Sequence, residues 1–371
     1  MKKMIVASAF FLGAGAVLAA DVTATAPTVY GKVNKEIKYI KQEDKFNTVK
    51  MLGPQDPTSS VSRLGAKGTV GTEGLKANYV LEMGLNSTGD NSSGTIALRQ
   101  AYISAGDFWG SVIAGQTDTA TWGIYTDIDP LQTTSAAMTT NQLSSTTDFQ
   151  ISNNSAPTSH QITGIGFLNR SRQDLVGYKS PNFQGLQFYT TWDKNNMNTN
   201  TVGTTNYTYW ENLLTFEKKL ALVTPKLYLG YVKQSGGMTL RKDTNLIGAV
   251  RVMVKDFVVG LSYSTRKNTT DTRSDINKKE KRMVATAKYT MGKLSAVATY
   301  AKAKVDNGLT NNDLDKANHT QCAASIAYNV YAPLELRLTY AKYKYEEDNN
   351  SQNEEHGNTA KVVIFGTQLT F

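Results

Sequence analysis

Apolar side chains occupy every second position over many short stretches of this chain. Between residues 75 and 85 the odd positions are Leu, Ala, Tyr, Leu, Met and Leu, whereas the even positions include Lys76, Asn78 and Glu82. A period of two is the signature of a β-strand with one apolar face. The same alternation recurs over residues 29–39, 257–263, 283–289, 294–300, 334–340 and 363–371. Several of the apolar faces end in Tyr or Phe, which is typical of the aromatic girdle at a membrane interface.

The connections between these stretches distinguish a membrane barrel from a soluble β-sandwich, which alternation alone does not. Short connections at residues 71–74, 106–110, 180–185, 255–256, 291–293 and 329–333 alternate with long ones, of which 117–170 is the longest. A sandwich has no reason to sort its loops in this way, whereas an outer-membrane barrel has tight turns on one side and long loops on the other. About sixteen segments of roughly 8–12 residues have the length that a tilted strand needs to cross a bilayer. The sequence therefore predicts an all-β, transmembrane antiparallel β-barrel with short periplasmic turns and long external loops.

The first twenty residues have the three parts of a secretory signal peptide. Lys2 and Lys3 precede an apolar stretch from residue 4 to 18, and small residues follow at Ala19 and Ala20. The apolar part is too short for a membrane-spanning helix. We expect residues 1–20 to be a signal peptide and residues 21–371 to form a single outer-membrane β-barrel. Removal of the two lysines lowers the formal net charge of +9 by two, so that the mature chain remains basic.

Composition argues against catalysis and against cofactors. The single Cys322 excludes an intrachain disulfide and a Cys-based zinc site. The three histidines, His160, His319 and His356, lie far apart in predicted external loops, so they do not form the base of a catalytic triad. The positive charges are dispersed along the chain, whereas nucleic-acid binders gather them on one face or tail. We expect no enzyme activity, no cofactor, no bound metal and no nucleic-acid partner.

Four stretches of sequence carry a resemblance to a known family. They are residues 30–32, residues 62–68 with 74–82, residues 98–103 with 115–116, and residues 169–172 with 177–186. Together they resemble the general diffusion porins of Gram-negative outer membranes, and the terminal Phe371 matches the assembly signal of outer-membrane barrels. The resemblance implies a sixteen-stranded barrel that assembles as a homotrimer. It also implies that the third external loop, here residues 117–170, folds into the lumen as a constriction loop.

In that family, basic side chains on the barrel wall face acidic side chains on the constriction loop. The resemblance places basic wall residues at Lys32, Arg63 and Arg99, and strand parity independently turns Lys32, Arg63 and Lys67 toward the lumen. Arg170, Arg172 and Lys179 lie where the family has another wall arginine, and the resemblance does not choose among them. The acidic candidates are Asp118, Asp127 and Asp129. Two alternatives remain open: Arg63 and Arg99 as solvated wall residues, and the last two acids as a turn before Pro130.

These observations predict a water-filled, charge-lined pore for passive diffusion of ions and small hydrophilic solutes. The net positive charge favours a weak preference for anions. The alternatives are a channel specific for sugar or phosphate, and a surface adhesin or structural barrel. The expected partners are further copies of the chain, lipopolysaccharide and outer-membrane lipid, the barrel assembly machinery and small hydrophilic solutes.

Overall fold

The structure is a computed structural model of the chain. It describes residues 22–43, 48–57, 60–86, 95–132, 136, 151–153, 156–158, 172–195, 207–236, 241–269, 279–306, 314–349 and 354–371. The predicted signal peptide at 1–20, the candidate wall residue Arg170 and most of segment 137–171 lie outside the described residues.

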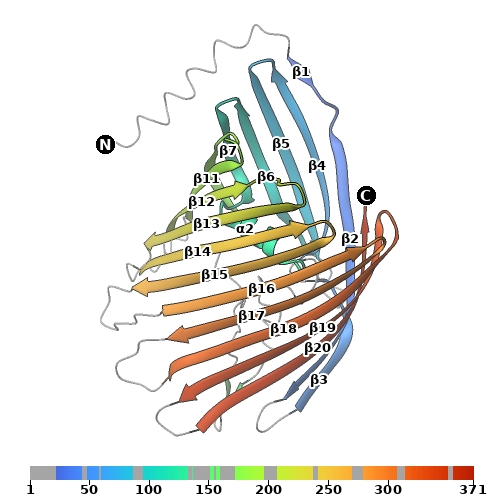
Figure 1. Cartoon of the computed structure of the whole chain (residues 1–371), viewed down its shortest axis with the longest axis vertical. Coiled ribbons are helices and arrows are strands. Elements are labelled where there is room, and N and C mark those ends of the chain that lie inside the picture. The colour runs from blue at the N-terminus through green and yellow to red at the C-terminus, as the bar shows by residue number, and fades with distance from the viewer. Residues whose placement is uncertain are drawn as a thin grey trace.

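Antiparallel strands form one continuous wall that closes on itself (Figure 1). In chain order they are β2 Thr28–Glu43, β4 Ser62–Thr72, β5 Leu75–Asn86, β6 Thr95–Asp107, β7 Gly110–Asp118, β10 Arg172–Lys179, β11 Leu186–Asn195, β12 Tyr207–Glu217, β13 Val223–Gly236, β14 Arg241–Val254, β15 Phe257–Thr269, β16 Lys279–Met291, β17 Leu294–Asp306, β18 Leu314–Tyr331, β19 Leu334–Asn349 and β20 Glu354–Thr370. Each strand pairs with the next, and β20 pairs with β2, which confirms the predicted closed barrel of sixteen strands.

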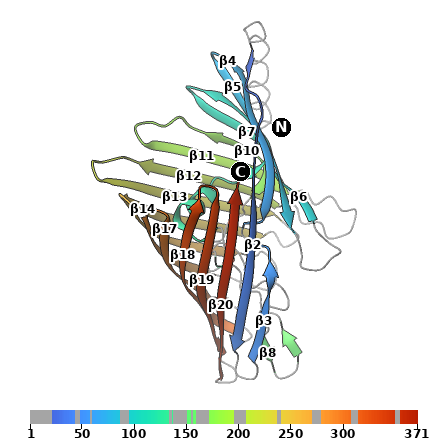
Figure 2. The same cartoon turned by 90° about the vertical axis from the view of Figure 1, so that its right-hand side faces the viewer.

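Two shorter strands, β1 and β3, extend the wall near β2 and β4. β3 (Thr48–Gln55) pairs with the second half of β2, whereas β4 pairs with its first half, so that β3 and β4 together fill one position in the wall. β1 (Thr23–Ala24) adds to β4. Figure 2 shows the wall curving from β20 through β2 to β3. A separate hairpin is formed by β8 (Ile151–Asn153) and β9 (Ala156–Thr158).

The exposure of the side chains is the reverse of that in a soluble protein. On β2, Val33 and Ile37 are 45% and 50% exposed, whereas Asn34 and Glu36 are 0% and 2% exposed. Because neighbouring side chains on a strand point to opposite faces, the apolar face lies outside and the polar face lines the interior. Within the described residues, each of the sixteen wall strands pairs with a neighbour on either side, as a hydrocarbon environment requires.

Tight turns connect the strands at one end of the barrel. The turns at 73–74, 108–109, 255–256 and 292–293 define this short-turn end. Gly292 has a φ of 57°, and Lys255 adopts a φ of 51°, which is the left-handed conformation typical of two-residue hairpin turns. At the other end the connection from β7 to β10 spans residues 119–171 and is the longest in the chain. This is the third connection at that end, in agreement with the order expected for the constriction loop.

The last residue of the chain closes the barrel against the first long strand. Gly31 N donates to Phe371 O at 2.8 Å, and Phe371 N donates to Gly31 O at 3.0 Å. A Cβ atom on Gly31 would lie 2.6 Å from Cζ of the Phe371 ring and 2.7 Å from the carbonyl oxygen of Arg63. Only glycine therefore permits this close approach.

Candidate functional site: a charged cluster in the barrel lumen

The segment after β7 turns inward and is held on the inner face of the wall. Ala120 N donates to Thr191 Oγ1 on β11 at 3.1 Å. Thr121 donates to Glu211 Oε2 on β12 twice, from its backbone N at 3.0 Å and from its Oγ1 at 2.6 Å. Because Thr121 is the N-cap of α2 (Trp122–Ile128), the buried Glu211 carboxylate fixes the point at which the helix begins.

The helix α2 packs across the inner wall. Ile124, Tyr125 and Ile128 are buried, and complete burial raises the pKa of the Tyr125 phenol well above its usual value. Ile128 O accepts a hydrogen bond from Thr286 Oγ1 on β16 at 2.8 Å. The helix is seven residues long. In the described part of the chain, no helix has the length and apolar character needed to cross a membrane.

Beyond α2 the loop continues along the same wall. Ala136 O accepts from Gln321 Nε2 on β18 at 2.7 Å. Residues 119–132 and residue 136 of the third loop therefore lie along the inner wall, from β11 to β18. Because β7 extends to Asp118, the loop begins at residue 119 rather than at 117. Most of the expected constriction loop 117–170 lies outside the described residues.

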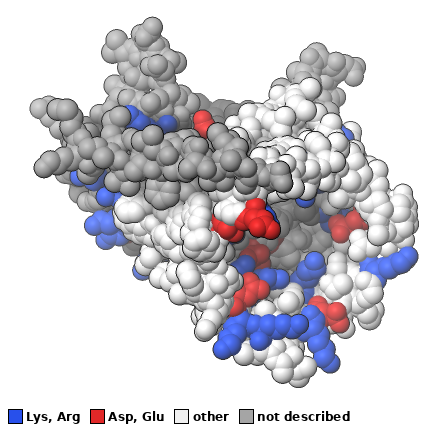
Figure 3. Space-filling model, turned by 90° about the horizontal axis from the view of Figure 1, so that it is seen from above, with Lys and Arg blue, Asp and Glu red and all other residues white. Residues whose placement is uncertain are grey.

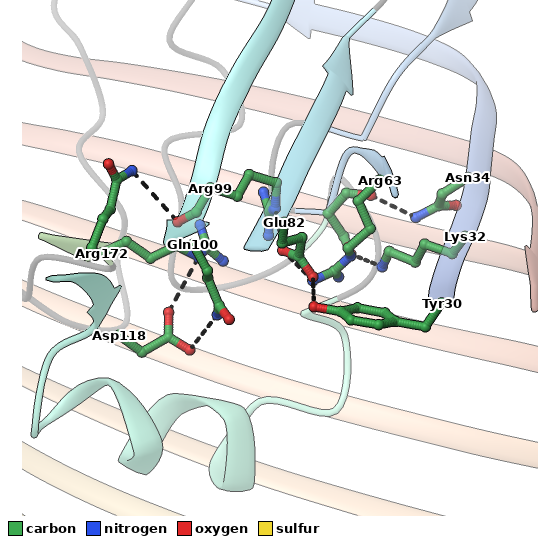
Figure 4. Close-up of polar contacts among 11 residues, drawn as sticks. Tyr30, Lys32, Asn34, Arg63, Glu82, Arg99, Gln100, Asp118 and Arg172 are labelled. Carbon is green, nitrogen blue, oxygen red and sulfur yellow. Dashed lines mark hydrogen bonds and ion pairs between the residues drawn. The ribbon is translucent and has the colours of Figure 1, made fainter. Parts of the chain in front are cut away.

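Two arginines on the opposite wall share one carboxylate (Figure 4). Arg99 Nε on β6 lies 2.8 Å from Glu82 Oε1 on β5, and Arg63 on β4 approaches the same oxygen with its Nη1 atom at 3.4 Å. Tyr30 OH donates to the other oxygen of Glu82 at 3.2 Å. Gly84 makes room for this arrangement, because a Cβ atom there would lie 2.7 Å from Arg99 Cδ.

Lys32 extends the basic surface along β2. Its ammonium donates to Ser60 Oγ, and Lys32 pairs in register with Arg63. Asn34 Nδ2 donates to Ser60 O at 3.0 Å, and its Oδ1 accepts from Arg337 Nη2 at 3.1 Å. The basic surface is thus continuous from β6 across β2 to β19.

Asp118 belongs to this same wall. It is the last residue of β7, pairs in register with Arg172 on β10, and lies with its Oδ1 atom 3.2 Å from Arg172 Nε. Gln100 Nε2 donates to Asp118 Oδ2 at 3.5 Å. Asp118, expected in the loop opposite the basic residues, is therefore a neighbour of those residues on a strand.

Asp127 and Asp129, the two acidic residues of the loop segment, both accept hydrogen bonds. Asp127 Oδ2 accepts from Lys226 Nζ and from Tyr228 OH, each at 2.6 Å, and both partners lie on β13. Asp129 is fully buried, and its Oδ1 accepts from Leu131 N at 2.9 Å. Asp129 thus forms the turn around Pro130, which was the alternative interpretation of this motif.

The remaining candidates lie at the edges of the cluster. Lys67 lies with its Nζ atom 5.4 Å from the centre of the Tyr30 ring. Lys179, the last residue of β10, lines a cavity of about 240 Å³ beside α2 together with Asp127 and Lys226. The sequence did not identify Glu82, Glu211 or Lys226 as site residues. Only Glu82 could have been found, because the alternation at residues 75–85 places it on the lumen-facing side.

The wall opposite α2 carries more positive than negative side chains in this cluster. Lys32, Arg63, Arg99 and Arg172 outnumber Glu82 and Asp118 on the wall. On the side of α2, Lys226 pairs with Asp127 at 2.6 Å and with Glu217 at 3.4 Å. Figure 3 shows charged side chains of both signs around a hollow on the face viewed. Within the described residues, no group of three His, Cys, Asp or Glu side chains could hold a metal ion.

Comparisons with known proteins agree with this architecture. A family model described as Gram-negative porin matches residues 5–363. No curated protein matches the sequence. The anion-selective porin from Comamonas acidovorans is 17% identical, with 95% of this chain and 100% of that chain covered and a TM-score of 0.64. The outer membrane channel DcaP of Acinetobacter baumannii is 16% identical, with 94% and 97% covered and a TM-score of 0.63.

A third similar structure is the trimer form of OmpT, an outer membrane protein of Vibrio cholerae. It is 12% identical, with 94% of this chain and 100% of that chain covered and a TM-score of 0.61. At these identities the solved structures show the fold alone, whereas the family model covers nearly the whole chain. The chain therefore belongs to the Gram-negative porin family and is an outer-membrane β-barrel.

Proposed function

We propose that this porin passes ions and small hydrophilic solutes through a charge-lined constriction and weakly prefers anions. The family and the fold point to a passive outer-membrane channel rather than to an enzyme. The observation that carries the anion preference is the pairing of Asp127 with Lys226 at 2.6 Å. This ion pair offsets the negative charge of Asp127 that would otherwise face the basic wall, and the same ammonium lies 3.4 Å from Glu217.

The size of the effect follows from Coulomb's law. Two unit charges 4 Å apart interact by about 1 kcal/mol in bulk water and by about 4 kcal/mol at an effective dielectric constant near 20. Energies of this size bias the passage of ions without stopping it. Because mobile ions screen charges beyond about 8 Å at physiological ionic strength, the preference should weaken as salt rises.

Reversal potentials in a potassium chloride gradient test this proposal. Purified protein in planar bilayers should show a small anion preference, and Arg99→Gln should shift the reversal potential toward that of a cation-preferring channel. Lys233→Gln is a suitable control because Lys233 lies on the outward-facing parity of β13. A cation preference in the unmodified protein would overturn the proposed selectivity.

We further propose that the protein assembles as a homotrimer. One similar structure is described as a trimer form, and the wall exposes apolar side chains that a second copy or lipid would cover. Native mass spectrometry in detergent would detect the trimer. Lipopolysaccharide remains a proposed lipid partner, and Phe371 a proposed signal for the barrel assembly machinery.

A further inference from the structure

A cavity lies between the constriction segment and the wall, on the short-turn side of α2. Its volume is about 560 Å³. Residues of α2 and of the turn after it cover one side, and the inner faces of β14 to β20 form the other. Four basic side chains line it. One is Arg337 on β19, and three come from adjacent parts of the wall: Arg251 on β14, Lys255 in the β14–β15 turn and Lys288 on β16.

These three cations are not neutralised by the wall around them. In the part of the chain that the structure describes, none of them forms an ion pair within 4 Å. Two of the three acids that line the cavity already have basic partners: Asp127 pairs with Lys226 at 2.6 Å, and Glu335 pairs with Arg337 at 3.4 Å. Asp256 is the remaining acid, so that the cavity keeps a surplus of positive charge.

The cavity is connected to the basic wall of the constriction. Arg337 lines the cavity and donates to Asn34 Oδ1 at 3.1 Å. Asn34 and Lys32 both donate to Ser60, and Lys32 is in register with Arg63. Figure 4 shows Asn34 and Lys32 next to Arg63. Hydrogen bonds therefore join the lining of the cavity to the basic wall of the constriction.

The lining is suited to a ligand that is both anionic and partly apolar. Met253, Val258 and Val297 supply apolar surface, and Thr290 and Ser295 supply hydroxyl groups. A guanidinium presents a planar fork of donors that matches a carboxylate. A chloride ion would use the charge of this lining but not its apolar surface.

We propose that this cavity is a binding site for small organic carboxylates, with Arg251 and Lys288 holding the carboxylate and Met253 and Val297 contacting the apolar body. The site rests on the proposed function, because it receives anions that have crossed the constriction. It extends that function from a general preference for anions to retention of one chemical class.

Benzoate is the probe for the experiment, and benzyl alcohol is its uncharged counterpart. Single-channel currents in potassium chloride are recorded with each compound added on the short-turn side, and the dissociation constant is obtained from the block. The double variant Arg251→Gln/Lys288→Gln should weaken benzoate block by at least roughly tenfold, since both charged donors to the carboxylate are replaced by neutral amides and charge-assisted hydrogen bonds are the stronger ones. Benzyl alcohol should block poorly in every variant.

The control is Lys76→Gln. Lys76 lies near the short-turn end of β5 and has the same lumen-facing parity as Glu82, but it does not line the cavity. It should leave benzoate block unchanged. Equal loss in this control, or unchanged block in the double variant, would overturn the site. If the double variant does not fold, the single variant Lys288→Gln answers the same question.

The outcomes separate the two proposals. Loss of benzoate block in the double variant alone supports the site even if the reversal potential of the unmodified channel shows cation preference, which would overturn only the proposed selectivity. Anion preference with unchanged benzoate block in the double variant would overturn only the carboxylate site.

Discussion

Arg99 Nε lies 2.8 Å from Glu82 Oε1, and this one oxygen is also the nearest acidic atom to Arg63, at 3.4 Å. A single carboxylate therefore orders two guanidinium groups that project from strands on either side of it. Because one negative charge cannot neutralise two positive ones, the wall remains basic at the level of α2. The shared carboxylate holds both arginine side chains in place, and the three groups together keep a net positive charge.

Replacing Glu82 tests this arrangement. Glu82→Gln should increase the preference for anions, since Arg63 and Arg99 lose their shared counter-charge. It should also lower the thermal stability of the barrel, because two like charges remain close together with less compensation. Reversal potentials and the temperature at which the folded band disappears on gels measure the two effects. An unchanged reversal potential would show that the cluster does not face the path of the ions.

The ion pair between Asp127 and Lys226 allows a double-mutant cycle. Lys226→Gln should shift selectivity toward cations, because Asp127 then faces the lumen without its ammonium partner. Asp127→Asn should shift it toward anions. Each single variant should also lower the thermal stability of the barrel, because it leaves one charge without its partner. The double variant should lose less stability than the sum of the two single losses. Purely additive losses of stability would contradict the pairing.

Glu211 should control the stability of the constriction segment. Its Oε2 atom accepts from Thr121 N at 3.0 Å and from Thr121 Oγ1 at 2.6 Å. Glu211→Ala leaves these buried donors unsatisfied, at a cost of about 1–3 kcal/mol for each group. Current recordings should therefore show more frequent transitions between conductance levels. Asp107→Asn, at the end of β6 away from this segment, is the control and should leave the frequency of these transitions unchanged.

Gly31 tests the closure of the barrel by its last residue. Gly31→Ala would place a Cβ atom 2.6 Å from the Phe371 ring and 2.7 Å from a backbone oxygen, so that the end of the chain must shift. The yield of folded protein and its thermal stability should both fall. Gly53→Ala is a matched control, because a Cβ atom there meets nothing within 4 Å. Equal stability of the two variants would contradict the contact.

Much of the fold was predictable from local sequence. The alternation at residues 29–39 predicted which side chains face outward, and Val33 and Ile37 are exposed while Glu36 is buried. Strand geometry makes this possible, since side chains alternate between the two faces wherever the strand lies. The parity of the loops likewise predicted the short-turn end. For the same reason, Lys32 and Arg63 were expected on the lumen-facing parity.

The sequence by itself determined the strands, their lipid-facing sides and the position of the long third loop, because each depends on neighbours a few residues apart. Only the tertiary structure decided that Lys226 engages Asp127, that Glu211 holds Thr121, and that Asp118 stands beside Arg172. These pairs are distant along the chain, and closure of the barrel brings them together. The sign of the field across the lumen depends on such pairings, so it follows from the closed wall and not from the pattern of residues along one strand.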